Sequence, residues 1–201
     1  MTEEAINEPI EKLGWFKRFS NSLVGEIIQI IIISLIIVIP FRIYIAQPFL
    51  VSGPSMDTTF ADGQYLIVDE FTYHTRAPQR GEVVIFKYPL DTKKYFIKRI
   101  IGLPSETVEI KNNVVSIINA DNPTGFVLPE SYIKIDKLNP PRPNTIVTLS
   151  AGEFFVLGDN RLVSSDSRIW GPVKQELITG RPFLRLFPFN KINLFPGQVK
   201  N

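Results

Sequence analysis

The most constraining feature of this sequence is an uncharged, isoleucine-rich run of 15 residues, Ile27 to Phe41. A helix that crosses a membrane needs roughly 20 apolar residues. The flanking charges of Glu26 and Arg42 can lie at the two interfaces, however, and the stem of Arg42 is itself apolar. We therefore predict a transmembrane helix over residues 24–46, preceded by a tail over residues 1–23 and followed by a larger domain over residues 47–201.

Two alternatives account for the same run. A helix buried in a protein core would be expected to show a polar face, whereas only Gln29 and Ser34 are polar here. A cleaved signal peptide would begin nearer the N-terminus and end in a small-x-small cleavage site, which the following residues lack. An uncleaved membrane anchor agrees with both observations.

Basic residues ahead of the run indicate its orientation. Lys12, Lys17 and Arg18 precede it, and lysine and arginine, rather than acidic residues, determine which end stays in the cytoplasm. We expect a single-pass protein of the cytoplasmic membrane that contacts membrane lipid. Residues 1–23 would be cytoplasmic, and residues 47–201 would lie on the outer face.

The composition excludes several classes of site. The chain has no cysteine and a single histidine, His74, which excludes disulfides, a thiol nucleophile and clustered metal ligands, and argues against a Ser-His-Asp triad. His74 lies in the polar stretch FTYHTRAPQR, which predicts an exposed loop. The net charge of +2, without a basic run interleaved with aromatics, argues against nucleic acid. We expect no metal, no cofactor and no nucleic-acid partner.

Beyond residue 47 the pattern changes to short strands. Segments rich in β-branched and aromatic residues are separated by Pro-, Gly- or Asn-rich breaks; they are QYLIVDEF, EVVIFKYPL, YFIKRIIGLP, ETVEI, NVVSII and EFFVLGD. A helical pattern is limited to a turn near residues 174–178. We predict a mostly β domain, in which the Pro- and Asn-rich part within about residues 107–150 forms an inserted lobe.

Lys98 lies between large apolar residues in YFIKRIIG. In a strand, Phe96, Lys98 and Ile100 share one face, while Ile97 and Arg99 lie on the other. Burial among apolar neighbours lowers the pKa of a lysine amine, and a neutral amine can act as a general base. On the pattern alone, a lysine whose head reaches water is the commoner case.

Ser55 lies in the Gly-Pro stretch VSGPSMDTTF, where a serine is commonly only a turn residue. Serine becomes a nucleophile beside a base, and without a suitable histidine a lysine is the remaining candidate. A third element, GDNRLVSSDSRIWGPV, concentrates Asp159, Ser164, Asp166 and Arg168 between a strand and a turn. Asp-Arg pairs would brace this loop, and a hydroxyl such as that of Ser164 would be suited to orient a neutral lysine.

Together these elements resemble the bacterial type I signal peptidases, which are membrane-anchored serine proteases with a Ser-Lys dyad. The motifs follow the same order, namely an anchor, RIYIAQPFLVSGPSM, GQYLIVDEF, RGEVVIFKYP, YFIKRIIGLPSETVEI and GDNRLVSSDSRIWGPV, and the likeness covers residues 24–192. SGPSM alone is a weak motif, whereas GDNR followed by S-x-DSR-x-WG is highly specific. The family implies a largely β fold and removal of signal peptides from exported preproteins after small-x-small sites, without a metal or cofactor.

The resemblance also assigns roles to individual residues. Ser55 corresponds to the nucleophile, whose main-chain N–H would donate to the oxyanion, and Lys98 to the general base. Ser164 corresponds to the hydroxyl that orients the lysine amine, and the loop around it would be braced by Asp159, Asp166 and Arg168. The positions that match pockets for small substrate side chains are Phe49, Val51, Phe60, Ile85, Phe96 and Ile97.

Several positions depart from a common pattern of the family, among them Gln64, where aspartate is commoner, and Leu162-Val163, which replace a polar pair. Thr58 stands where many members have proline, and Gly53, two residues before Ser55, offers no side-chain donor for an oxyanion, although Ser52 is adjacent. Two other functions remain open: a self-cleaving Ser-Lys protease, and a catalytically silent membrane-anchored β module that binds partners. The expected anchor, without a DNA-binding module, argues against the first, and the presence of every catalytic position argues against the second.

Overall fold

A computed structural model describes residues 23–44, 47–133 and 144–199 of the chain. The chain divides into two compact units, residues 1–44 and residues 45–201, which are described separately. The predicted N-terminal tail therefore lies outside the described residues, as do residues 45–46 at the end of the expected span and most of the Pro-rich break NPPRPN.

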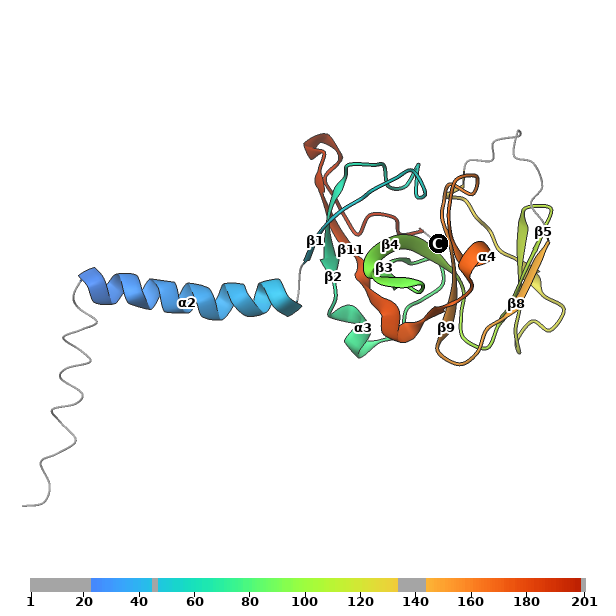
Figure 1. Cartoon of the computed structure of the whole chain (residues 1–201), viewed down its shortest axis with the longest axis horizontal. Helices are drawn as coiled ribbons and strands as arrows, with labels where there is room; N and C mark the ends of the chain where they lie inside the picture. Colours follow the sequence, from blue (N-terminus) through green and yellow to red (C-terminus); the bar gives the residue numbers. More distant parts are fainter. Residues whose placement is uncertain (1–22, 45–46, 134–143, 200–201) are drawn as a thin grey trace, which may run out of the picture. The chain divides into compact units, whose positions relative to one another are not determined.

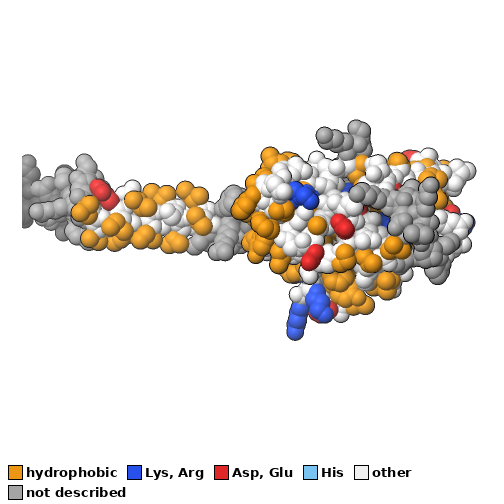
Figure 2. All heavy atoms as spheres, turned by 90° about the horizontal axis from the view of Figure 1, so that it is seen from above, with side chains coloured by type: hydrophobic (Ala, Val, Ile, Leu, Met, Phe, Trp, Pro, Cys, Tyr) orange, Lys and Arg blue, Asp and Glu red, His pale blue; other side chains and the backbone are white. Residues whose placement is uncertain are grey.

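The first unit contains helix α2 (Leu23–Tyr44). Its large side chains between Leu23 and Val38 are exposed, and apolar side chains cover the surface of α2 that faces the viewer in Figure 2. Within the part of the chain that the structure describes, no helix combines the length and the apolar character needed to cross a membrane.

The second unit is built on a large antiparallel sheet, shown in Figure 1. In the described residues its strand order is β1–β2–β11–β3–β4–β9–β10, and β12 pairs with β11. The strands are β1 (Gln47–Leu50), β2 (Tyr65–Asp69), β3 (Val83–Tyr88), β4 (Asp91–Gly102), β9 (Glu153–Leu157), β10 (Val173–Lys174), β11 (Ile178–Phe187) and β12 (Asn193–Leu194). The long central strand β4 pairs with both β3 and β9.

A smaller antiparallel sheet lies on the β9 side of the larger one (Figure 1). Its order is β7–β6–β5–β8, with β5 (Thr107–Lys111), β6 (Val114–Ile118), β7 (Phe126–Val127) and β8 (Thr145–Thr148). All these strands fall within residues 107–150, the range in which we expected an inserted lobe. The mostly β fold is thus confirmed, with two antiparallel sheets.

Short helical turns complete the unit. They are α3 (Thr72–Thr75), α4 (Ser167–Trp170) and two 3₁₀ turns, η1 (Gln175–Leu177) and η2 (Phe189–Lys191). The predicted turn near residues 174–178 is therefore present as η1. The expected loop at His74 is a helical turn instead, and the backbone N–H groups of Phe71 and Thr72 at its start donate to the Asp69 carboxylate. His74 is exposed, as expected.

Apolar side chains form separate buried clusters under the two sheets. One cluster joins the sheets, because residues of β4 and β9 pack there against residues of β5 and β6; its members are Ile101, Val108, Ile110, Val115, Ile117, Leu149, Phe155 and Leu157. A second cluster contains Val84, Phe86, Ile100, Phe154, Val156 and Val173. A third lies under the Gly-Pro stretch and contains Val51, Met56, Phe60, Leu66 and Val83. Strand β4 contributes to the first two clusters, which fixes its position within the unit.

Candidate active site

Ser55 lies in the nucleophile loop, which we define as residues 51–64, between β1 and β2. Backbone hydrogen bonds close this loop at its base, from Val51 N to Gln64 O and from Gly63 N to Val51 O, each 2.9 Å long. Met56 and Phe60 are fully buried beneath it. Their burial anchors the loop to the core, so that Ser55 itself remains partly exposed.

Lys98 is brought to this serine by β4. Its Nζ donates to Ser55 Oγ at 2.8 Å and to the carbonyl oxygen of Ile97 at 2.9 Å. Lys98 is only 4% exposed. The alternative that its ammonium group extends into solvent is therefore wrong. Burial lowers the pKa of Lys98 to about 8, against the opposing attraction of the Asp166 and Asp159 carboxylates. About a tenth of the amine is therefore neutral at pH 7, and this fraction grows as the pH rises toward the pKa.

The loop over residues 158–168 follows β9 and holds the backbone of Ser55. The N–H of Asn160 donates to the carbonyl oxygen of Ser55 at 3.0 Å, and the N–H of Gly158 donates to Asp166 Oδ2 at 3.1 Å. Arg168 donates two hydrogen bonds of 2.7 Å to the Asp166 carboxylate, from Nε to Oδ1 and from Nη2 to Oδ2. Burial acts to raise the pKa of Asp166, but this guanidinium outweighs it and the pKa is lowered. Asp166 and Arg168 thus lie where a bracing role requires them.

Ser164 lies in the same loop and is 2% exposed, but it does not make the expected bond to the lysine amine. Its Oγ has no hydrogen-bond partner of ordinary geometry among the described residues. The hydroxyl does lie near enough to Asp166 to help lower the pKa of that carboxylate. The Lys98 amine is instead held by Ser55 and a backbone carbonyl.

A buried ion pair between Arg99 and Asp159 ties these loops together. Nε and Nη2 of Arg99 donate to the two carboxylate oxygens at 2.9 and 2.6 Å, and both side chains are 1% exposed. Thr59 Oγ1, from the nucleophile loop, donates to the same carboxylate at 2.5 Å. Arg99 Nη1 also donates to the carbonyl oxygens of Gly81 and Gly197, each at 2.7 Å. Asp159 therefore braces both loops.

Arg99 and Thr59 were not among the predicted site residues. The only signal for Arg99 was a charged residue between Ile97 and Ile101 on one face of a strand, because such a residue must find a partner if that face is buried. Thr59 gave no signal, since its partner lies 100 residues later in the chain.

A cavity of about 440 Å³ opens beside Ser55 and Lys98. Five of the six predicted pocket residues line it, namely Phe49, Val51, Ile85, Phe96 and Ile97, and the lining is completed by Leu50, Ser52, Leu66, Lys94, Tyr95, Val163 and Ser165. The expectation for Phe60 is not met, because its side chain is 0% exposed in the cluster beneath the nucleophile loop. The cavity is mostly apolar and suits uncharged side chains.

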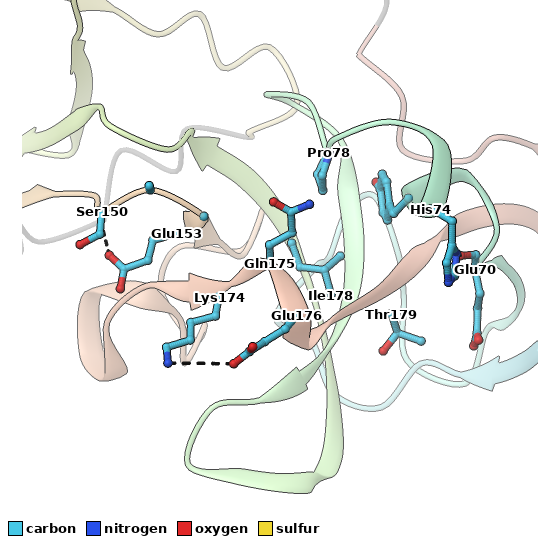
Figure 3. A pocket seen from close by; sticks show the side chains of 13 residues that line it. Glu70, His74, Pro78, Ser150, Glu153, Lys174, Gln175, Glu176, Ile178 and Thr179 are labelled. Carbon is cyan, nitrogen blue, oxygen red and sulfur yellow. Dashed lines mark hydrogen bonds and ion pairs between the residues drawn. The ribbon is translucent and has the colours of Figure 1, made fainter.

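A larger hollow, of about 770 Å³, lies elsewhere in the second unit (Figure 3). Its lining includes Glu70, His74, Glu153, Lys174 and Glu176, and it shares no residue with the cavity at Ser55. In Figure 3 these side chains are spread around the hollow, and dashed lines join Lys174 to Glu176 and Ser150 to Glu153. Among the described residues, no group of three or more histidine, aspartate or glutamate side chains is placed to hold a metal.

Comparison with known proteins gives consistent matches. The family model described as signal peptidase, peptidase S26, matches residues 24–187. A protein named probable signal peptidase I-1 from Synechocystis sp. is 34% identical over 176 residues, which cover 84% of this chain and 85% of that protein. Signal peptidase IB from Staphylococcus aureus is 32% identical over 188 residues, covering 86% and 96%. A crystal structure of a signal peptidase I from Enterococcus faecalis V583 is 32% identical and covers 53% of this chain and 97% of that one, with a TM-score of 0.45.

Proposed function

Because this chain belongs to the peptidase S26 family of signal peptidases, we propose that its signal peptidase I activity is carried out by Ser55 as nucleophile and Lys98 as general base. The observation that carries this assignment is the 2.8 Å contact between Lys98 Nζ and Ser55 Oγ, made by a lysine that is almost fully buried. Burial lowers the pKa of this amine, so that more of it is in the neutral form that can accept a proton.

The reaction then follows from the geometry. Neutral Lys98 takes the proton of Ser55 Oγ as this oxygen forms a bond to the scissile carbonyl carbon. The ammonium so formed gives its proton to the leaving amine when the C–N bond breaks, which leaves an acyl-enzyme on Ser55. Lys98, neutral again, removes a proton from a water molecule that attacks the ester, and the proton returns to Ser55 Oγ.

The developing oxyanion needs donors beside Ser55. The main-chain N–H of Ser55 is the first candidate. Gly53 has a backbone φ of +87° and donates its own N–H to Asp62 Oδ1 at 2.7 Å, so it supplies no side chain to the oxyanion. Ser52 lines the cavity and is the second candidate. Thr58, in place of a proline, removes none of these groups.

The substrates would be the signal peptides of exported preproteins, cleaved after small-x-small sites. The cavity beside Ser55 is lined largely by apolar side chains, which supports small uncharged residues next to the cut. Lining residues at this cavity include no carboxylate, so it has no partner for a basic substrate side chain.

Attachment of the protein to the cytoplasmic membrane through the α2 region, with residues 1–23 inside and residues 47–201 outside, is supported by the apolar run and the basic residues before it. Exposed apolar side chains also cluster over the end of the second unit that carries β1, β2 and β11 (Figure 2). They include Leu50, Tyr65, Leu186, Phe187, Phe189, Ile192 and Leu194. An apolar surface of this kind is suited to contact with lipid.

The test is cleavage of a peptide with an Ala-x-Ala junction by the full chain in detergent. We expect cleavage after the second alanine by the parent protein and none by Ser55→Ala or Lys98→Ala, with unchanged melting of the Ser55 variant as the folding control. Full activity in either variant would refute the dyad. A silent binding module would leave the peptide intact, and a self-cleaving protease would cut only its own chain.

A further inference from the structure

Glu130 lies outside every motif considered so far, on the segment that follows β7 of the smaller sheet. It forms a two-pronged ion pair with Arg161, in which Nη1 of the arginine donates to Oε2 at 3.1 Å and Nη2 donates to Oε1. The side chains are 13% and 12% exposed. A bidentate pair with little access to water has a fixed geometry, and this one connects the smaller sheet to the 158–168 loop.

The smaller sheet holds Glu130 in place. The N–H of Leu128 donates to the carbonyl oxygen of Val115 in β6 at 2.9 Å, and the N–H of Ile133 donates to the carbonyl oxygen of Glu130 at 3.0 Å. Leu128 and Tyr132 also pack against the cluster that joins the two sheets. The position of the Glu130 carboxylate is therefore fixed by a hydrogen-bonded turn whose neighbouring side chains pack against the core.

On the other side of the pair, Arg161 is part of the loop that holds the nucleophile. Its Nε donates to the carbonyl oxygen of Gly158 at 3.1 Å, and its own carbonyl oxygen accepts from Arg168 Nη2 at 3.0 Å. The preceding residue, Asn160, donates its N–H to the carbonyl oxygen of Ser55. If Arg161 moved, Asn160 next to it would move too, and with it the hydrogen bond to the carbonyl oxygen of Ser55.

A second contact leads from the same segment toward the lysine. Tyr132 donates its hydroxyl to Glu130 Oε1 at 3.0 Å, and the Arg99 guanidinium lies 4.0 Å from the centre of the Tyr132 ring. Arg99 adjoins Lys98 on β4. Burial, together with the Glu130 charge, raises the pKa of Tyr132, so that it stays a hydrogen-bond donor. Glu130 therefore contacts the loop that holds Ser55, and Tyr132 contacts Arg99, the neighbour of Lys98.

From these contacts we propose that Glu130 is a positioning residue, which fixes the distance between Ser55 and Lys98 by holding Arg161. The inference rests on the proposed Ser-Lys dyad. Without the Glu130 carboxylate, the Arg161 guanidinium loses two hydrogen-bond acceptors in a poorly hydrated position and turns toward water. Its hydrogen bond to the carbonyl oxygen of Gly158 is then lost as well. The effect falls mainly on kcat, because neither Glu130 nor Arg161 lines the substrate cavity.

The experiment measures kcat and KM for the Ala-x-Ala peptide with the full chain in detergent. We expect Glu130→Ala to lower kcat about 10- to 100-fold, with KM changed less than about threefold. Glu130→Gln, which has the same shape and keeps one acceptor, should lie between the parent and the alanine variant. Arg161→Ala should resemble Glu130→Ala. The double variant should have a kcat no lower than that of the less active single variant, because both changes break the same contact.

Glu109→Ala is the matched control, since this carboxylate lies on β5 of the same sheet and pairs with Lys111 rather than with the 158–168 loop. It should keep the parent kcat. A folded Glu130→Ala with kcat within about twofold of the parent, or losses that multiply in the double variant, would overturn the proposal. If the alanine variant shows no cooperative melting, Glu130→Gln decides in the same way. Failure of the parent to cleave would refute the proposed function instead, so the two failures are distinguishable.

Discussion

Lys98 Nζ donates a 2.8 Å hydrogen bond to Ser55 Oγ, although the two residues lie 43 positions apart in the sequence. The lysine comes from the centre of a sheet and the serine from a loop anchored by buried side chains. The contact therefore depends on the whole second unit being folded, and its chemistry depends on the burial of one amine. The following predictions test these dependences.

Activity should rise with pH through the pKa of Lys98. Burial lowers that pKa to about 8, and the protonated amine cannot act as a base. We expect kcat/KM for the peptide to fall about tenfold for each pH unit below this value and to level off above it. A pH titration of initial rates in detergent measures this limb. A flat profile from about pH 6 to pH 9 would contradict a lysine base.

Lys98→Met should make the folded protein more stable while abolishing cleavage. The folded-state pKa of Lys98 lies below its unfolded value of 10.5, so between the two the unfolded state binds more protons, and the folded state gains stability as pH rises through that window. At pH 7 the lysine costs about 3 kcal/mol, which an apolar side chain of similar length would recover in part.

Thermal unfolding at pH 7 measures this gain. Lys87→Met, on the exposed side of neighbouring β3, is the control and should change stability by less than about 0.5 kcal/mol. A Lys98→Met variant that melts below the parent would show that the lysine contributes to stability in the folded state, contrary to this account.

Gly158→Ala should impair catalysis by crowding the site. A Cβ at this position would lie 2.2 Å from Ser164 Oγ and 2.4 Å from the carbonyl oxygen of Ser55, so the two loops would have to separate. We expect kcat to drop about 100-fold or more. Gly152→Ala is the control for a methyl group added at a glycine without crowding, because its Cβ meets nothing within 4 Å, although its φ is +77°. That control should lose about 1 kcal/mol of stability and keep its activity.

Arg99→Met should destabilise the protein strongly. It would leave the Asp159 carboxylate, 1% exposed, without its guanidinium, at a cost of about 3–5 kcal/mol in the free energy of unfolding. Chemical denaturation measures the loss, and Arg99→Met combined with Asp159→Asn should restore part of it. Lys94→Met, which breaks the exposed pair with Asp91, should cost less than about 1 kcal/mol. Equal losses in the two single variants would contradict the role given to burial.

The sequence pattern predicted strands rich in β-branched and aromatic residues, and it missed the shortest strands and the ten-residue β11. β3 and β4 stand out because runs of β-branched and aromatic residues fill them. β7, β10 and β12 contain two residues each, which is too short for any period. β11 was missed because Gly180 and Pro182 interrupt it, and the structure has a register shift beside each of them.

Within the site, the motifs located both members of the dyad, but they could not decide whether Lys98 is buried, because burial is a property of the packed sheets. Phe60 shows the same limit. A phenylalanine near the nucleophile suits a pocket or a core equally well, and only the structure places it beneath the loop. Glu130 and Arg161 are 31 residues apart and lie on different elements, so their contact leaves no local signal.

The most direct test of the central claim is the rate at which a serine-directed acylating reagent labels Ser55 in the parent and in Lys98→Met, followed by peptide mapping. The account predicts labelling at Ser55 that accelerates as pH rises through about 8, and a slow rate, without this pH dependence, in Lys98→Met. Labelling of Lys98→Met at the parent rate, or modification of a different serine in the parent, would contradict activation of Ser55 by the neutral amine of Lys98.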